Sequence, residues 1–214
     1  QDGIRRMYGE NQEDIFYYLT TMNENYVQPE MPAGAEEGIV KGIYKLETVA
    51  GSGKGKVQLM GCGTILEEVR KAAQALAKDF GVSADVFSVT SFNELTRDGQ
   101  AAERWNMLHP TAEPKQAYIS QVLSADTPAI VATDYMKIYG EQLRAFVPTD
   151  YKVLGTDGFG RSDSRANLRH HFEVDAKFIV IAALKSLVEM PVDVLTKAIA
   201  EYGIDADKIN PQFA

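Results

Sequence analysis

The sequence has little cysteine, little histidine and no long hydrophobic run. Its one cysteine, Cys62, cannot form an internal disulfide bond, which suits a reducing compartment, so we expect a cytoplasmic protein. The three histidines, His109, His170 and His171, are too few for a histidine-rich metal site, and we expect no metal ligands. No apolar run approaches the roughly 20 residues that a membrane span needs, and no signal peptide is evident.

Positive charge is also in short supply. The chain has 22 Lys and Arg against 30 Asp and Glu, a net charge of −8, which disfavours nucleic acid and anionic membranes as partners. There is no internal repeat and no low-complexity tract. The first residue is Gln1 rather than Met, and we therefore expect a chain cut from within a longer polypeptide.

The most distinctive stretch is Gly155-Thr-Asp-Gly-Phe-Gly-Arg-Ser-Asp-Ser-Arg165, which follows the apolar residues Val153 and Leu154. Three glycines permit a tight loop, and the serines and Asp163 can cap a following helix. The loop is either functional or a plain connection between a strand and a helix, since such residues are common in turns. It does not fit the dinucleotide or P-loop phosphate patterns.

From residue 56 onward, strands alternate with helices. Capping boxes begin at Thr64 and Ser91, and Asp134 and Asp175 are also predicted to cap helices. The predicted strands are Val57–Met60, Ala84–Thr90, Pro128–Ala132 and Lys152–Leu154, and the predicted helices are Ile65–Phe80, Ser91–Leu108, Gln116–Leu123, Asp134–Val147, Asn167–Phe172, Ala176–Glu189 and Pro191–Tyr202. This order predicts an α/β fold in three layers, a mostly parallel sheet with helices on both faces.

The first part of the chain has a different composition. Residues Asp14–Thr21 are rich in aromatic and β-branched side chains without strict alternation, which predicts a strand buried on both faces. The polar, proline-containing residues 23–34 form a connector, where we place a domain boundary. A short helix is predicted over Ala35–Leu46, and Gly51–Gly55 is predicted to be a hairpin or loop tip.

In a parallel sheet, ligands bind at the carboxyl ends of the strands. The loops predicted there are 61–64, 90–93, 133–135 and 155–164. Gly61 and Gly63 follow a strand, but the third glycine of a dinucleotide site is missing, so a tight turn is the favoured interpretation. The loops contain no nucleophile elbow, no Cys-His pair and no metal-spaced carboxylates, and Cys62 is more typical of a small turn residue than of a nucleophile.

Several longer strings go beyond local patterns. They are Asn23-Glu-Asn-Tyr26, Lys41-Gly-Ile-Tyr-Lys-Leu-Glu47, Ser88-Val-Thr-Ser-Phe92, Glu103-Arg-Trp-Asn-Met-Leu-His-Pro110, Thr133-Asp-Tyr-Met136, and the 155–165 loop with Leu168-Arg-His-His-Phe-Glu-Val-Asp175. With these strings the whole chain resembles the carboxyl-terminal part of the homodimeric bacterial pyruvate dehydrogenases, the thiamine-dependent first components of their complexes. Asp157-x-Phe-Gly-x-Ser162 is similar, more distantly, to transketolases.

This resemblance implies a domain plan and an activity for the parent enzyme. Residues 1–25 would be the tail of a pyrimidine-binding domain, 26–40 a linker, and 41–214 a transketolase-type carboxyl-terminal domain. The parent would use thiamine diphosphate and Mg²⁺ to decarboxylate pyruvate oxidatively and would acetylate the lipoyl group of its partner, dihydrolipoyl acetyltransferase. The family's cofactor motif and catalytic residues have no match here, so we carry over no catalytic, cofactor-binding or metal-binding residue.

The residues of the 155–165 loop are therefore predicted to make interdomain or subunit contacts. Phe159 would be the apolar anchor, and Arg161 or Arg165 would pair with carboxylates, because aromatic and arginine side chains dominate interface energetics. Asp157 and Ser162 belong to the same surface. Two alternatives remain open for the chain: a transketolase or another thiamine-dependent 2-oxoacid dehydrogenase, and a stand-alone module for dimerisation or docking.

Overall fold

The computed structural model describes all of residues 1–214. The chain divides into two compact units, Gln1–Glu30 and Met31–Ala214. No helix of either unit is long and apolar enough to cross a membrane. The assignment of residues 1–25 to a preceding domain, and of 26–40 to a linker, stays a prediction.

The first unit contains one helix, α1 (Asp2–Tyr8), which the sequence did not predict. The strand predicted over Asp14–Thr21 was wrong for this structure, because these residues have no regular secondary structure. Phe16 and Tyr18 are each 85% exposed. A strand needs neighbouring strands for its backbone hydrogen bonds and for cover on its faces, and these thirty residues provide neither.

The second unit is built on a five-stranded sheet with the strand order β1-β3-β2-β4-β5. Strand β1 pairs antiparallel with β3, and the other neighbours pair in parallel. The strands are β1 (Ile43–Val49), β2 (Lys56–Gly61), β3 (Ser83–Val89), β4 (Ala129–Ala132) and β5 (Tyr151–Leu154). The predicted mostly parallel sheet is confirmed.

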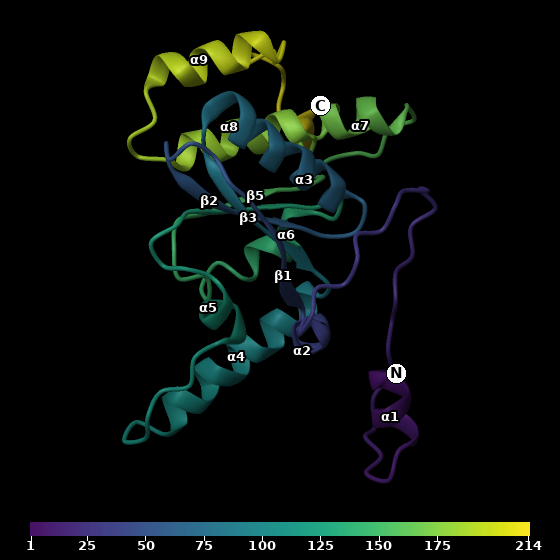
Figure 1. The fold of residues 1–214 in the computed structure, drawn as a ribbon. Coiled ribbons are helices and arrows are strands. Elements are labelled where there is room, and N and C mark those ends of the chain that lie inside the picture. The colour runs from purple at the N-terminus through teal and green to yellow at the C-terminus, as the bar shows by residue number, and fades with distance from the viewer. The chain divides into compact units, whose positions relative to one another are not determined.

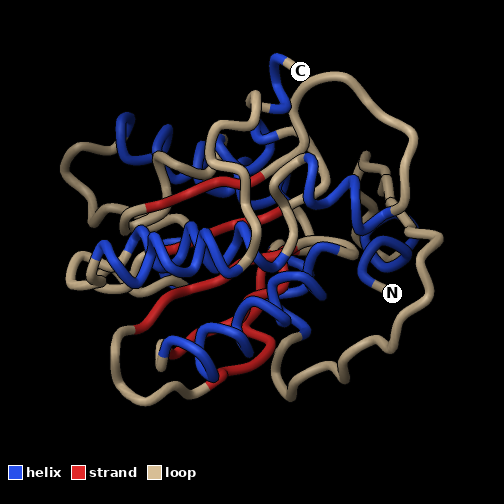
Figure 2. The backbone as a smooth tube through the Cα atoms, turned by 90° about the horizontal axis from the view of Figure 1, so that it is seen from above, coloured by secondary structure: helices blue, strands red, loops and turns tan.

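Helices cover both faces of this sheet (Figures 1 and 2). They are α2 (Glu36–Lys41), α3 (Ile65–Ala75) with its continuation η1 (Leu76–Phe80), α4 (Phe92–Leu108), α5 (Tyr118–Val122), α6 (Lys137–Glu141), α7 (Arg165–His171), α8 (Ala176–Ser186), α9 (Val192–Glu201) and η2 (Pro211–Phe213). Figure 1 shows α3 and α8 on one side of the sheet and α4, α5 and α6 on the other.

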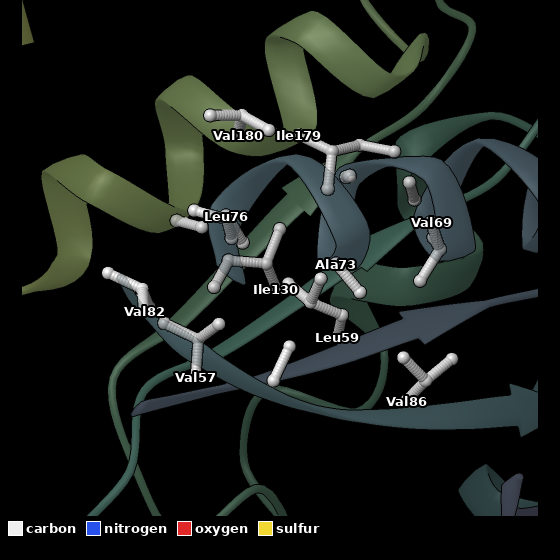
Figure 3. Packing of buried hydrophobic residues seen from close by; sticks show 14 of the residues in the cluster. Val57, Leu59, Val69, Ala73, Leu76, Val82, Val86, Ile130, Ile179 and Val180 are labelled. Carbon is white, nitrogen blue, oxygen red and sulfur yellow. The ribbon is translucent and has the colours of Figure 1, made fainter. Parts of the chain in front are cut away.

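Successive residues of the central strands point into two separate cores. Leu59 and Ile130 belong to the core under α3 and α8, whereas Met60 and Val131 belong to the core under α4 and α5. Figure 3 shows the first core, in which the strand side chains interdigitate with those of α3 and with Ile179 of α8. The predicted three-layer α/β fold is confirmed.

Most helix ends follow the predicted signals. Ser91 Oγ accepts a hydrogen bond from the Glu94 N–H at 3.1 Å, and Asp175 Oδ1 accepts from the N–H groups of residues 177 and 178 at 3.0 and 3.1 Å. Gly81 and Gly203 follow their helices with φ values of 70° and 64°, the left-handed conformation that glycine adopts without strain.

Three local predictions were wrong. The helix predicted to run to Leu46 ends at Lys41, because Gly42 has φ 107°, and β1 begins directly after it with β-branched and aromatic residues. Thr64 makes no side-chain cap on α3. Asp134 does not cap α6, which begins later, at Lys137, and ends at Glu141.

Candidate functional site

Hydrogen bonds join neighbouring loops at the carboxyl edge of the sheet. Cys62, after β2, lies with its Sγ 3.1 Å from Thr133 Oγ1, after β4. Burial raises the pKa of Cys62 to about 12, so its thiol is protonated at neutral pH and is a poor nucleophile. The interpretation of Cys62 as a turn residue is consistent with this contact.

The loops after β4 and β5 are held against each other. The Thr156 N–H donates to the Tyr135 carbonyl at 2.9 Å, and a side chain on Gly155 would lie 2.9 Å from the backbone of residues 135 and 137. Asp157 Oδ1 accepts a hydrogen bond from the Lys137 N–H at 3.1 Å, at the start of α6. At the start of α6, Asp157 therefore accepts the hydrogen bond that we had predicted for Asp134.

Beyond Asp157 the loop leaves the sheet edge and its side chains face solvent. Phe159 is 84% exposed, and Arg161, Ser162 and Arg165 are exposed as well. Of the five residues predicted to make contacts, Asp157 thus holds the base of the loop and the other four are accessible. Their contacts with another domain or subunit stay a prediction.

The loop ends in a well-capped helix. Ser164 Oγ accepts from the Asn167 N–H at 3.3 Å, so Ser164, one of three candidates, caps α7. Asp163 Oδ1 accepts from Asn167 Nδ2 at 2.8 Å and from the Ser164 N–H at 2.6 Å, and these bonds lower the pKa of Asp163. The loop therefore has fixed ends, as an interaction loop on a scaffold requires.

The arginines of this region separate into different environments. Arg161, Arg165 and Arg169 are spaced four residues apart in the sequence, but α7 begins at Arg165, so Arg161 lies outside the helix and the three do not form one arginine face. Arg169 Nη1 lies 3.4 Å from Glu68 Oε1 of α3, inside the fold. Arg161 has no ion pair within the chain.

The three histidines make structural contacts. His109 stacks on Trp105, with ring centroids 4.4 Å apart. His170 Nδ1 lies 2.9 Å from Asp175 Oδ2, beside the cap of α8. His171 Nε2 is buried without a hydrogen-bond partner, and burial, with Arg161 and Lys208 nearby, lowers the pKa of His171.

The residues present do not fit thiamine diphosphate and Mg²⁺. Magnesium requires several oxygen ligands in a near-octahedral arrangement, and no group of three or more His, Cys, Asp or Glu side chains is placed to hold a metal ion. At the edge near the loop, Asp157 and Asp163 already accept backbone N–H groups.

Comparisons with known proteins agree with the fold. The family described as the transketolase-like TK C-terminal domain matches residues 42–175. The chain is 64% identical over its whole length to the pyruvate dehydrogenase E1 component of Escherichia coli (strain K12), and 61% identical to that of Haemophilus influenzae. It spans 24% and 25% of these two relatives, about a quarter of their length.

Solved structures show a weaker likeness. Transketolase from Leishmania mexicana is 19% identical, with a TM-score of 0.47 over 72% of this chain and 19% of that one. The match over residues 42–175 covers well over half of the sequence. The chain therefore belongs to the transketolase-like TK C-terminal domain family.

Proposed function

We propose that the chain is the carboxyl-terminal part of a thiamine diphosphate-dependent pyruvate dehydrogenase, the first component of its multienzyme complex. The observation that carries this proposal is the 64% identity, over all of the chain, to a protein named pyruvate dehydrogenase E1 component. The match covers 100% of the chain rather than one of its elements.

In such an enzyme the reaction would be the oxidative decarboxylation of pyruvate, followed by acetylation of a lipoyl group on dihydrolipoyl acetyltransferase. Thiamine diphosphate and Mg²⁺ would be held by polypeptide outside these 214 residues, in a cytoplasmic homodimer. The chain would contribute structure: a rigid α/β scaffold, and contacts through Asp157, Phe159, Arg161, Ser162 and Arg165. The solvent-facing position of Phe159 supports this role, because an 84% exposed phenylalanine is available to a partner.

The chain alone is expected to be inactive. The test is to measure pyruvate-dependent reduction of an artificial electron acceptor with thiamine diphosphate and Mg²⁺, using the 214-residue chain and the longer protein in parallel. We expect turnover, and acetylation of an added lipoyl domain, only with the longer protein. Calorimetric titration of the chain with thiamine diphosphate and Mg²⁺ should give no binding heat.

Two outcomes would contradict the proposal. Turnover by the chain alone would show that it holds a catalytic site. A longer protein that binds thiamine diphosphate but transfers ketol groups between sugar phosphates, and does not decarboxylate pyruvate, would instead favour the transketolase alternative.

A further inference from the structure

We propose that segment 204–213 and loop 155–165 form one binding surface, and that this surface is occupied by polypeptide of the same longer protein outside these 214 residues. The loop–tail surface, as we name it, consists of Phe159, Arg161, Ile209 and Phe213. The inference rests on the proposed contact role of the loop and adds to it a second segment that no sequence signal indicated.

The two segments touch through their backbones. Gly158 has φ 98°, and a Cβ atom on it would lie 2.2 Å from the carbonyl oxygen of Pro211. Pro211 is buried although its neighbours Asn210 and Gln212 are exposed. Only glycine permits both this conformation and this close approach. Phe159 and Phe213 therefore extend from neighbouring points of one backbone contact.

A second anchor holds the segment at Lys208. Lys208 Nζ donates to the His171 carbonyl at 2.9 Å and pairs with Glu173 Oε1 at 3.2 Å. A cation at the end of α7 is also favoured by the helix dipole. Because the segment is held at Lys208 and at Pro211, little conformational entropy remains to be lost when a partner binds.

The held segments expose apolar side chains. Phe159 is 84% exposed, Phe213 is 77% exposed and Ile209 is 66% exposed. Single exposed apolar residues are common on protein surfaces, but these three belong to two segments in direct contact. Arg161 adds an exposed cation that has no ion pair within the chain. The partner should therefore offer an apolar pocket next to a carboxylate.

The occupant is most simply the rest of the same protein. The chain spans only 24% of the relatives with which it shares 64% identity, so about three quarters of such a polypeptide lies outside it. A small molecule is a poorer fit, because small ligands occupy concave sites. A pocket of the second unit is lined by residues from 53–55, 79–80 and 187–201 and takes none from the loop–tail surface.

Hydroxyl-radical footprinting with mass spectrometry tests the inference without any substitution. Oxidation of Phe159 and Phe213 is measured in the 214-residue chain and in the longer protein, with Met107, 71% exposed at the end of α4, as the reference. We expect both phenylalanines to be oxidised in the chain and to lose most of that reactivity in the longer protein.

The outcomes separate this inference from the proposed function. Protection of both phenylalanines supports the loop–tail surface. Protection of Phe159 with Phe213 still reactive leaves the contact role of the loop intact but overturns the inference. Protection of Phe213 alone overturns it too, and if both remain reactive, the inference and the contact role both fail.

A matched pair of substitutions tests whether the two segments act as one. Gly158→Ala should separate them, because the new Cβ atom would collide with the carbonyl oxygen of Pro211. A Cβ atom on Gly160 would have no atom within 4 Å, so Gly160→Ala should leave the contact intact. In the longer protein, Gly158→Ala should restore oxidation of Phe213 and Gly160→Ala should not. If the two variants give the same footprint, the segments are independent and the inference is wrong.

Discussion

The buried carboxylate of Glu68, on α3, accepts a hydrogen bond from the backbone N–H of Ala176 at 3.1 Å. Ala176 is the first residue of α8, so a side chain from one helix satisfies an N–H group at the start of another. The other carboxylate oxygen lies 2.8 Å from Lys71 Nζ and 3.4 Å from Arg169 Nη1. Glu68 thus joins α3, α7 and α8.

The first prediction concerns this junction. Glu68→Ala should lower the free energy of unfolding by about 3 kcal/mol, because the partly buried Ala176 N–H loses its hydrogen-bond acceptor and Arg169 loses its contact with Glu68. Urea unfolding of the 214-residue chain measures the effect. Glu103→Ala, at an exposed position of α4, is the control and should change stability by no more than about 0.5 kcal/mol. Equal losses in the two variants would show that Glu68 is not a structural junction.

The second prediction concerns Gln58, a buried residue of β2. Its Nε2 donates to the carbonyls of Ser124 and Thr127 at 3.0 and 2.7 Å, and its Oε1 accepts from the Ser124 N–H at 2.8 Å. Gln58→Leu removes these bonds and should cost about 2–3 kcal/mol, because buried backbone groups are left unsatisfied. Thermal unfolding measures the loss, with the exposed Gln100→Leu as control. A Gln58→Leu variant as stable as the parent chain would contradict this account of the 124–128 turn.

The third prediction is a pH dependence. Burial raises the pKa of Cys62 from 9.0 to about 12, so well below pH 9 its thiolate fraction is about a thousandfold lower than in the unfolded chain. The contribution of the protonated thiol to stability is complete below pH 9, and it is lost as the pH rises from 9 towards 12.

Thiol labelling checks this directly. At pH 8 a thiol reagent should react with Cys62 slowly in the folded chain and rapidly in urea. Rapid labelling of the folded chain would mean that Cys62 is accessible as a thiolate. The Cys62→Ser variant should then show which part of the alkaline loss of stability belongs to this residue.

The fourth prediction concerns residues Asp14–Thr21. Their amides should exchange rapidly with solvent in the 214-residue chain, where Phe16 and Tyr18 are exposed, and slowly in the longer protein, because an apolar strand requires neighbours on both sides. Hydrogen exchange with mass spectrometry compares the two. Strong protection in a proven monomer of the chain, or rapid exchange in both proteins, would contradict the prediction.

Sequence patterns predicted the layers of this fold well because the layers depend on local signals. Helical spacing from Ile65 to Phe80, the serine cap at Ser91 and the aspartate cap at Asp175 each act within one element. The patterns failed where contacts distant in sequence decide the structure. Strand β1 is stabilised by antiparallel pairing with β3, which lies about 40 residues further along the chain. Helix α6 starts at Lys137, whose N–H donates a hydrogen bond to Asp157 from another loop.

The loop–tail surface was likewise predictable where local signals decide and not where distant contacts do. From sequence alone, the glycines and the charged residues marked 155–165 as unusual, and Ser162, Asp163 and Ser164 were equal candidates for the helix cap that the structure assigns to Ser164. Nothing in the sequence indicated that Pro211 lies against Gly158, because their contact joins backbone atoms far apart in the chain. A glycine such as Gly158 permits close approach of another backbone segment, but the sequence does not say which segment that is.

The central claim is that the 155–165 loop serves contacts outside this chain, and the Phe159→Ala variant tests it most directly. Dimer dissociation of the longer protein and thermal unfolding of the 214-residue chain are measured in parallel. If Phe159 fills a desolvated pocket across the contact, the dimer should weaken by about 2–4 kcal/mol, while the chain, in which this side chain is 84% exposed, should unfold as before. A dimer constant that does not change, together with a chain that loses several kcal/mol of stability, would make Phe159 a core residue and the loop only a turn.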